Sequence, residues 1–350
     1  DAGAIPQIQD AIANPVADAY EMFFRNPITE EENADFTEHR ICRLFRNRPE
    51  YRFNSRIHEN IETAVGRNHG TIGQLSAVIH HIGYAQRLIE ERHKGERYTR
   101  ILEQEVADHP GNVFYLHHLI AAYCAYNKMD KALESLNEAI EIAELNNPFT
   151  PIIWATLVNV LVELDRADEA LDACEKSHQR GVYQHPQLYF CKGNAFTRLE
   201  RYDEAVECYK KAIEEGRGKT WNGDTQTAGY KADFGIANAL HKMGRNSEAI
   251  PYLLKVLDVK PRHLSANEVL TKAYSATNQN DKYEEQLIVL QKLAPNDPGP
   301  FIRLAEIYEG RNEIEKAKDI YVQIIGNLDD TAALEFKLGS FYEILEDTEN

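Results

Sequence analysis

One small side chain, repeated at a nearly constant spacing, constrains the fold of this sequence more than any other feature. Alanine follows a short polar turn at five places, which recur with a step near 34 residues. A step of this size is typical of proteins built from stacked helix pairs. A small residue at each step would let the two helices of a pair approach closely. The five positions are Ala132, Ala170, Ala205, Ala249 and Ala317, with Tyr283 in the slot between the last two.

The helix that precedes each alanine has a pattern of its own. It carries a small or apolar residue twelve positions before the alanine and an aromatic residue or leucine nine positions before it, as in Gly193 and Phe196. The stretch Tyr189 to Gly216, YFCKGNAFTRLERYDEAVECYKKAIEEG, resembles the tetratricopeptide repeat, and Trp154 stands at the tryptophan position of that repeat. The resemblance implies a mainly α-helical solenoid. Its expected units are 113–146, 151–184, 186–216, 230–263, 264–297 and 298–331, with a loop near 216–227 and a partial unit up to residue 350.

A ladder of asparagines marks the expected binding face. The ninth residue of each first helix faces the concave surface in such repeats, and three successive units carry asparagine there, whereas later units carry Lys272 and Glu306. An amide offers both a hydrogen-bond acceptor and donors, so it can hold a peptide backbone without reading side chains. The alternative is a polar helix face that is merely solvated. The predicted peptide-binding residues are Asn159, Asn194, Asn238, Phe190, Arg198, Lys231, Phe234, His241 and Lys242.

Residues 1–84 lack the repeat and have a different apolar pattern. Their spacing predicts α/β structure, but the segment is too short for a whole α/β domain. The expected strands are Ala19–Phe24, Ile41–Phe45 and a third within Ile72–Gly83, and the expected helices are Ala4–Ala13 and Asn60–Arg67.

Three polar motifs in this segment occur in an informative order. They are RLFRNRPEYRF at 43–53, IHE at 57–59 and IHHIGY at 79–84. Together they resemble the C-terminal half of bacterial family 2 glycosyltransferases of the GT-A type, in which a long helix, here 86–108, leads into tetratricopeptide repeats. The resemblance implies a partial glycosyltransferase segment at 1–84, a connecting helix at 85–112 and a solenoid at 113–350. It also implies sugar transfer from a nucleotide-sugar donor to an acceptor peptide or protein.

The resemblance assigns roles to individual residues. Glu59 would be the general base, since a carboxylate can deprotonate an acceptor hydroxyl or thiol. His58 and one of His80 or His81 would contact a divalent metal, Mg or Mn, or the diphosphate.

Two arginines are the candidates for binding the departing diphosphate. Arg43 and Arg46 can grip it, and strand alternation predicts that they lie on opposite faces, so that only one does so. The half of the domain that ends in a DxD-like metal motif has no counterpart here, because Gly3 stands where the second acidic residue of Asp1-Ala2-Gly3 would be. We therefore expect a truncated donor site with little turnover. The alternative function is a non-catalytic scaffold in which the α/β segment only caps the solenoid.

The amino-acid composition limits the classes of partner that we expect. A net charge of -17 and a pI near 5.3 disfavour nucleic acid, although six arginines cluster between Arg40 and Arg56. Five scattered cysteines without a CxxC pair favour reduced core thiols. No apolar run of membrane-spanning length and no signal peptide is visible, so we expect a soluble cytoplasmic chain that binds a peptide or protein, with a homodimer also possible.

Overall fold

The computed structural model groups the chain into two compact units, Asp1–Ala143 and Glu144–Asn350. Within the described residues, no helix is both long enough and apolar enough to span a bilayer. The structure describes residues 3–27, 36–53, 56, 61–80, 94–182, 185–219, 221, 223–325 and 338–342.

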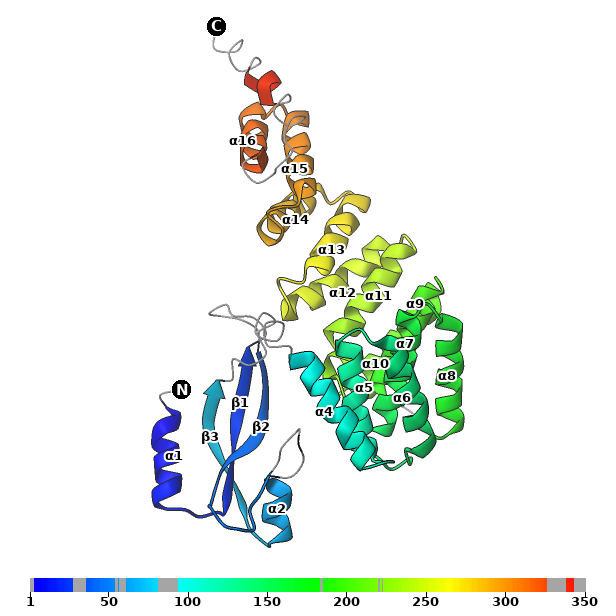
Figure 1. The fold of residues 1–350 in the computed structure, drawn as a ribbon. Helices are drawn as coiled ribbons and strands as arrows, with labels where there is room; N and C mark the ends of the chain where they lie inside the picture. Colours follow the sequence, from blue (N-terminus) through cyan, green and yellow to red (C-terminus); the bar gives the residue numbers. More distant parts are fainter. Residues whose placement is uncertain are drawn as a thin grey trace. The chain divides into compact units, whose positions relative to one another are not determined.

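The first unit contains a three-stranded sheet in the order β2-β1-β3 (Figure 1). Strand β1, Ala19–Pro27, pairs antiparallel with β2, Phe36–Phe45, and parallel with β3, Ile72–His80. Helices α1, Ala4–Ala13, and α2, Glu62–Arg67, accompany the sheet. The predicted α/β character of this segment is confirmed; β1 and β2 are longer than their apolar patterns suggested, and β3 lies within the predicted range.

The sheet has an apolar core on each face. Met22 and Ala77 pack with Ala4 of α1 on one face. On the other face, Cys42 packs with Val65 of α2. Successive residues of a strand point to opposite faces, so a short sheet can bury both of its faces against helices.

A β-bulge interrupts the pairing of β1 with β2. Tyr20 lies opposite Leu44 and Glu21 lies opposite Cys42, which leaves Arg43 as an extra residue without a partner on β1. Arg46 follows the last residue of β2. The expectation that strand alternation sets the faces of these two arginines is therefore wrong, because one lies in a bulge and the other lies beyond the strand.

The described part of the first unit ends with the helices α4, Lys94–Asp108, α5, Val113–Ala125, and α6, Met129–Ile142. The expected connecting helix is helical from residue 94, and its first part, 86–93, lies outside the described residues. The first helix pair, α5 and α6, groups with the N-terminal segment in the compact unit, although it belongs to the repeats by sequence.

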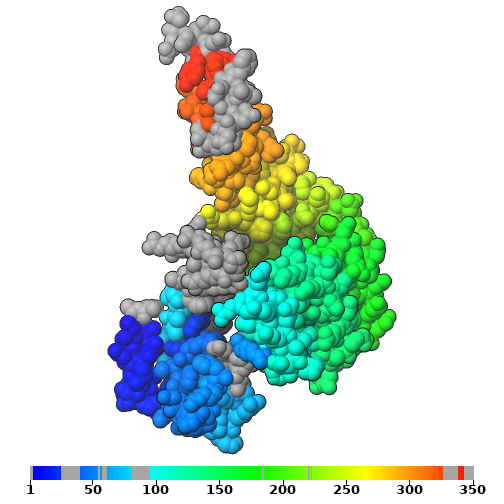
Figure 2. All heavy atoms as spheres, in the orientation of Figure 1, coloured from blue at the N-terminus to red at the C-terminus, as the bar shows by residue number. Residues whose placement is uncertain are grey.

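The second unit is a stack of helix pairs. Within this unit each helix packs on its neighbours in sequence, and the first helices also contact one another in the series α7, α9, α11 and α13. Figure 1 shows these helices following one another in sequence order from green through yellow to orange, and the same order of colours is seen in Figure 2. The predicted solenoid is confirmed, with pairs α7 (Thr150–Glu163) and α8 (Ala167–Gln179), α9 (Pro186–Arg198) and α10 (Tyr202–Gly216), α11 (Tyr230–Lys242) and α12 (Asn246–Val259), α13 (Leu264–Ala276) and α14 (Asn280–Leu293), and α15 (Pro298–Gly310) and α16 (Ile314–Ile325). A 3-10 turn, Thr225–Ala228, lies in the predicted loop before α11.

The repeated small residues lie where the helices approach each other. The alanines at 132, 170, 205, 249 and 317 all have 0% exposed surface. At Gly193 on α9, an added Cβ would lie 2.7 Å from the Tyr209 ring of α10, well inside ordinary contact. The spacing found in the sequence therefore reflects close packing of helices.

The turn inside each helix pair repeats one backbone conformation. A residue with positive φ ends the first helix, and the next N–H donates to the carbonyl five residues back, as Arg201 N donates to Phe196 O at 2.9 Å. This Schellman-type closure suits glycine and asparagine, which tolerate the left-handed region. The positive-φ residues of these turns are Asn127, Asp165, Glu200, Gly244, Asn278 and Asn312.

Candidate functional site

Helices α9 and α11 carry the same residue types at equivalent positions. Each has phenylalanine, then asparagine four residues later, then a cation four residues after that, a spacing that keeps all three on one side of a helix. The aromatic and amide side chains are half-buried and the cations are exposed. The two helices contact each other directly. We call this surface the repeat face; it consists of Phe190, Asn194, Arg198, Phe234, Asn238 and Lys242.

A buried tyrosine orients the amide of Asn194. The Tyr209 hydroxyl donates to Asn194 Oδ1 at 2.8 Å. The Tyr209 ring lies against both Gly193 and Gly235, where an added Cβ would come within 2.7 Å of ring atoms. Burial raises the pKa of Tyr209 to about 12, so its hydroxyl keeps its proton and remains a donor. The Asn194 Nδ2 has no acceptor among the described residues and keeps its two N–H groups for a further hydrogen bond.

The cations on and beside this face differ in their availability. Arg198 pairs with Asp165 at 2.8 Å, but both side chains are exposed and such pairs are weak. Lys242 has no ion pair within the described part of the chain. Lys231 is held by Asp224, 2.5 Å away in the loop before α11, so it is less available for a ligand than the sequence suggested.

Two other predicted residues lie in different settings. His241 Nδ1 is 2.6 Å from Asn246 Oδ1, which ties the ring to the first residue of α12. Asn159 on α7 is half-buried at the position equivalent to Asn194, but buried Ala155 replaces the phenylalanine four residues earlier. The full pattern therefore occurs on α9 and α11, and α7 carries only the amide.

Most of the predicted catalytic residues cannot be placed. Glu59, His58 and His81 lie outside the described residues. His80 is the last residue of β3 and is exposed. In the residues that the structure describes, no group of three or more His, Cys, Asp or Glu is arranged to hold a metal ion. The predicted base and metal ligands stay predictions.

The structure separates two residues that the diphosphate prediction had grouped together. His80 pairs with Arg25 at one end of the sheet. Arg46 follows β2 at the opposite end, where Ala19 pairs with Phe45 and Ile72. The length of β1 lies between them. The guanidinium of Arg43 lies between two aromatic rings, 5.6 Å from the centroid of Phe53 and 5.9 Å from that of Phe24.

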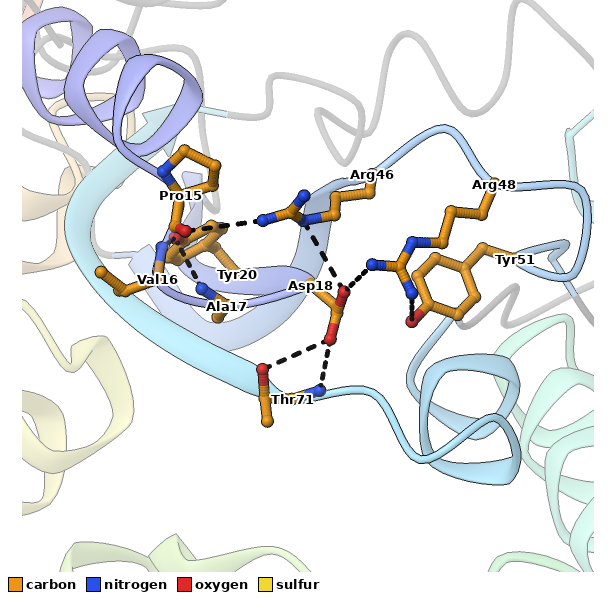
Figure 3. Close-up of polar contacts among 9 residues, drawn as sticks. All are labelled: Pro15, Val16, Ala17, Asp18, Tyr20, Arg46, Arg48, Tyr51 and Thr71. Atoms are coloured by element: carbon orange, nitrogen blue, oxygen red, sulfur yellow. Dashed lines mark hydrogen bonds and ion pairs between the residues drawn. The ribbon is translucent and has the colours of Figure 1, made fainter.

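Sequence reasoning missed Asp18, the residue that organises two of the clustered arginines (Figure 3). Asp18 Oδ1 lies 2.7 Å from Arg48 Nη2 and 3.6 Å from Arg46 Nε. Asp18 Oδ2 accepts hydrogen bonds from Thr71 N at 3.0 Å and Thr71 Oγ1 at 3.4 Å. The Thr71 backbone N–H, together with the two arginines, holds the pKa of Asp18 below its usual value. The signal in the sequence was the arginine cluster, but nothing local pointed to a partner about thirty residues earlier.

Comparison with known proteins supports the repeats. Two family models, each described as tetratricopeptide repeat, match residues 186–215 and 234–263, the two units that contain the repeat face. RNA polymerase II-associated protein 3 of Rattus norvegicus is 26% identical over 187 residues, which cover 47% of this chain and 28% of that protein. A TPR repeat-containing protein of Synechococcus elongatus is 26% identical over 151 residues, 41% of this chain and 36% of its own length. This chain thus spans about a third of the curated relatives it matches.

A solved structure agrees on the fold. The C-terminal part of a TPR repeat-containing protein from Cytophaga hutchinsonii matches with a TM-score of 0.50 and 14% identity, over 71% of this chain and 96% of that one. Neither the matching family models nor these relatives carry the name of a glycosyltransferase, so they give the GT-A resemblance no support. Residues 186–215 and 234–263 are tetratricopeptide repeats, and they form part of an α-solenoid that follows a small α/β segment.

Proposed function

We propose that the chain is an interaction protein whose tetratricopeptide repeats bind an extended peptide segment on the repeat face. The observation that supports this most is the phenylalanine, asparagine and cation series repeated on α9 and α11. A scaffold that binds a partner needs no catalytic residues, and it fits the relatives at least as well as sugar transfer does.

The spacing of the two amides suits an extended chain. Neighbouring packed helices lie about 8–10 Å apart, and an extended peptide rises about 3.3 Å per residue. Asn194 and Asn238 would therefore meet backbone groups about three residues apart. An amide that bonds to backbone selects an extended conformation and leaves side-chain specificity to its neighbours.

The neighbouring residues give the peptide its expected chemistry. Half-buried Phe190 and Phe234 can cover apolar side chains of the ligand. Arg198 and Lys242 add exposed positive charge to the same face of a chain whose net charge is -17. We therefore expect the ligand to carry an acidic residue or a terminal carboxylate beside an apolar residue.

The proposal is tested with peptides selected from a random displayed library on the full chain. Losing two net hydrogen bonds, in Asn194→Ala combined with Asn238→Ala, should weaken binding by roughly 5- to 150-fold. Asn159→Ala should weaken peptide binding less, because α7 lacks the aromatic residue. Asn296→Ala, an exposed asparagine between α14 and α15, is the matched control and should bind normally.

Two results would count against the proposal. The first is that the selected peptides bind the folded Asn194→Ala, Asn238→Ala double variant as tightly as they bind the unchanged protein. The other is binding that is insensitive to salt, which would remove Arg198 and Lys242 from the interaction. Sugar transfer, the metal and a homodimer stay predictions from the sequence.

A further inference from the structure

A cavity of about 410 Å³ lies in the first unit beside the C-terminal end of α1. Its apolar wall comes from α1, the following loop and the end of β2, and its polar wall comes from β1 and the loop after β2. The side chains that matter here are Ala11, Ala17 and Leu44 on the apolar wall and Tyr20, Arg46 and Arg48 on the polar one.

The Tyr20 hydroxyl provides a hydrogen-bond donor with no acceptor in the described structure. Tyr20 is 5% exposed, and its hydroxyl oxygen accepts from Val16 N at 2.8 Å and Ala17 N at 3.1 Å (Figure 3). These two bonds use both acceptor positions of the oxygen, so the hydroxyl can only donate further. No residue that the structure describes accepts that hydrogen. A buried donor of this kind costs free energy unless a partner fills the site.

Two arginines at the cavity share a single carboxylate. Asp18 binds both guanidinium groups, while its other oxygen is taken by Thr71. Among the described residues, the Arg46 side chain otherwise reaches only the Pro15 carbonyl, at 3.5 Å, and the Arg48 side chain only Tyr51, whose hydroxyl is at 3.4 Å. One positive charge is therefore in excess, and each guanidinium keeps N–H groups that no described residue accepts.

We propose that this cavity binds a small organic oxyanion, a carboxylate or a phosphate ester, with an apolar group attached. The oxygens would accept from Arg46, Arg48 and the Tyr20 hydroxyl, and the apolar group would pack on the alanines and Leu44. The polar wall offers donors and excess positive charge, which selects an anion rather than an amine. The volume lies within the range of small-molecule sites. This site is at the opposite end of the sheet from His80 and does not depend on the sugar-transfer prediction.

Methyl-detected NMR titrations of the unmodified full chain test the site directly. The probes are benzoate, phenyl phosphate, inorganic phosphate and the neutral benzamide. Benzoate or phenyl phosphate at millimolar concentration should shift the methyls of Ala11, Ala17 and Leu44 in a saturable way. Val65, on the other face of the sheet, is the reference and should not move. A response to only one of the two anions identifies which oxyanion the site takes.

A pair of variants tests the charge. Arg46→Gln should weaken binding roughly tenfold, the loss expected for one charge-assisted hydrogen bond at a half-exposed site. Arg67→Gln, an exposed arginine of α2 away from the cavity, should leave binding unchanged. If Arg46→Gln fails to fold, the titrations of the unmodified chain still decide. Absence of saturable shifts with both organic anions overturns the proposal, and equal binding of benzamide removes the anion requirement. Equal binding of inorganic and phenyl phosphate removes the apolar subsite.

Discussion

The contact between Gly193 and Tyr209 gives the sharpest test of how the repeats pack. Replacing Gly193 by alanine should gain about 1 kcal/mol of helix propensity. The new Cβ would lie 2.7 Å from the Tyr209 ring, whereas ordinary carbon contacts are about 3.5–4.0 Å. The ring cannot simply retreat, since Gly235 on α11 approaches it equally closely. Overpacking of this kind typically costs about 1–3 kcal/mol, so the variant should be destabilised by about 0–2 kcal/mol.

Gly310 provides the matched control. It ends α15, and an added Cβ there meets nothing within 4 Å. Gly310→Ala should therefore be neutral or stabilising by up to about 1 kcal/mol, so the two variants should differ by up to about 3 kcal/mol. Because repeat arrays can unfold in steps, native-state hydrogen exchange in α9, α10 and α15 is the appropriate assay.

A second background checks the cause. Tyr209→Leu removes the ring. In this background Gly193→Ala should lose most of its destabilising effect, so the two substitutions should show a coupling energy of about 0.5–3 kcal/mol. If Gly193→Ala protects α9 as much as Gly310→Ala protects α15, the steric argument is refuted.

Two further predictions concern a turn and a carboxylate. Glu200 has a φ of 58°, and Gly244 occupies the equivalent position of the next repeat. Because glycine adopts this left-handed conformation without the strain of a Cβ, Glu200→Gly should stabilise the repeat by about 0.5–1 kcal/mol and Gly244→Ala should destabilise it, as measured by thermal unfolding. A loss of stability in Glu200→Gly would contradict this. The pKa of Asp18 is lowered in the native state, so its contribution to stability is complete above its usual value of 3.8 and is lost as the pH falls through the native value. The stability difference between the unchanged protein and Asp18→Asn should be constant above roughly pH 5 and shrink on further acidification, and a difference that grows in acid would refute the role of the carboxylate.

Much of the solenoid was predictable because its contacts are local in sequence. The alanines at a step near 34 residues are the buried points of helix pairs, and the strand and helix segments of residues 1–84 appear where apolar spacing placed them. Both patterns depend on helices or strands that bury one face, a property that periodicity expresses directly. The equivalent positions of Asn194 and Asn238 followed from the same register.

The details of both sites depended on contacts that periodicity does not encode. Only the packing of α9, α10 and α11 shows that Tyr209 holds the Asn194 amide, and only the loop before α11 shows that Asp224 holds Lys231. The pairing of β1 with β2 placed Arg43 in a bulge.

The sequence by itself determined the repeated helix pairs and the types of residue on their exposed face, because neighbouring units pack through the same short-range pattern. Tertiary structure decided which polar groups remain available to a ligand. Asp18 and Thr71 are 53 residues apart in sequence, yet their contact positions Arg46 and Arg48 beside a cavity. Such pairings form only when distant segments are brought together by burial of the sheet faces, so no local pattern announces them.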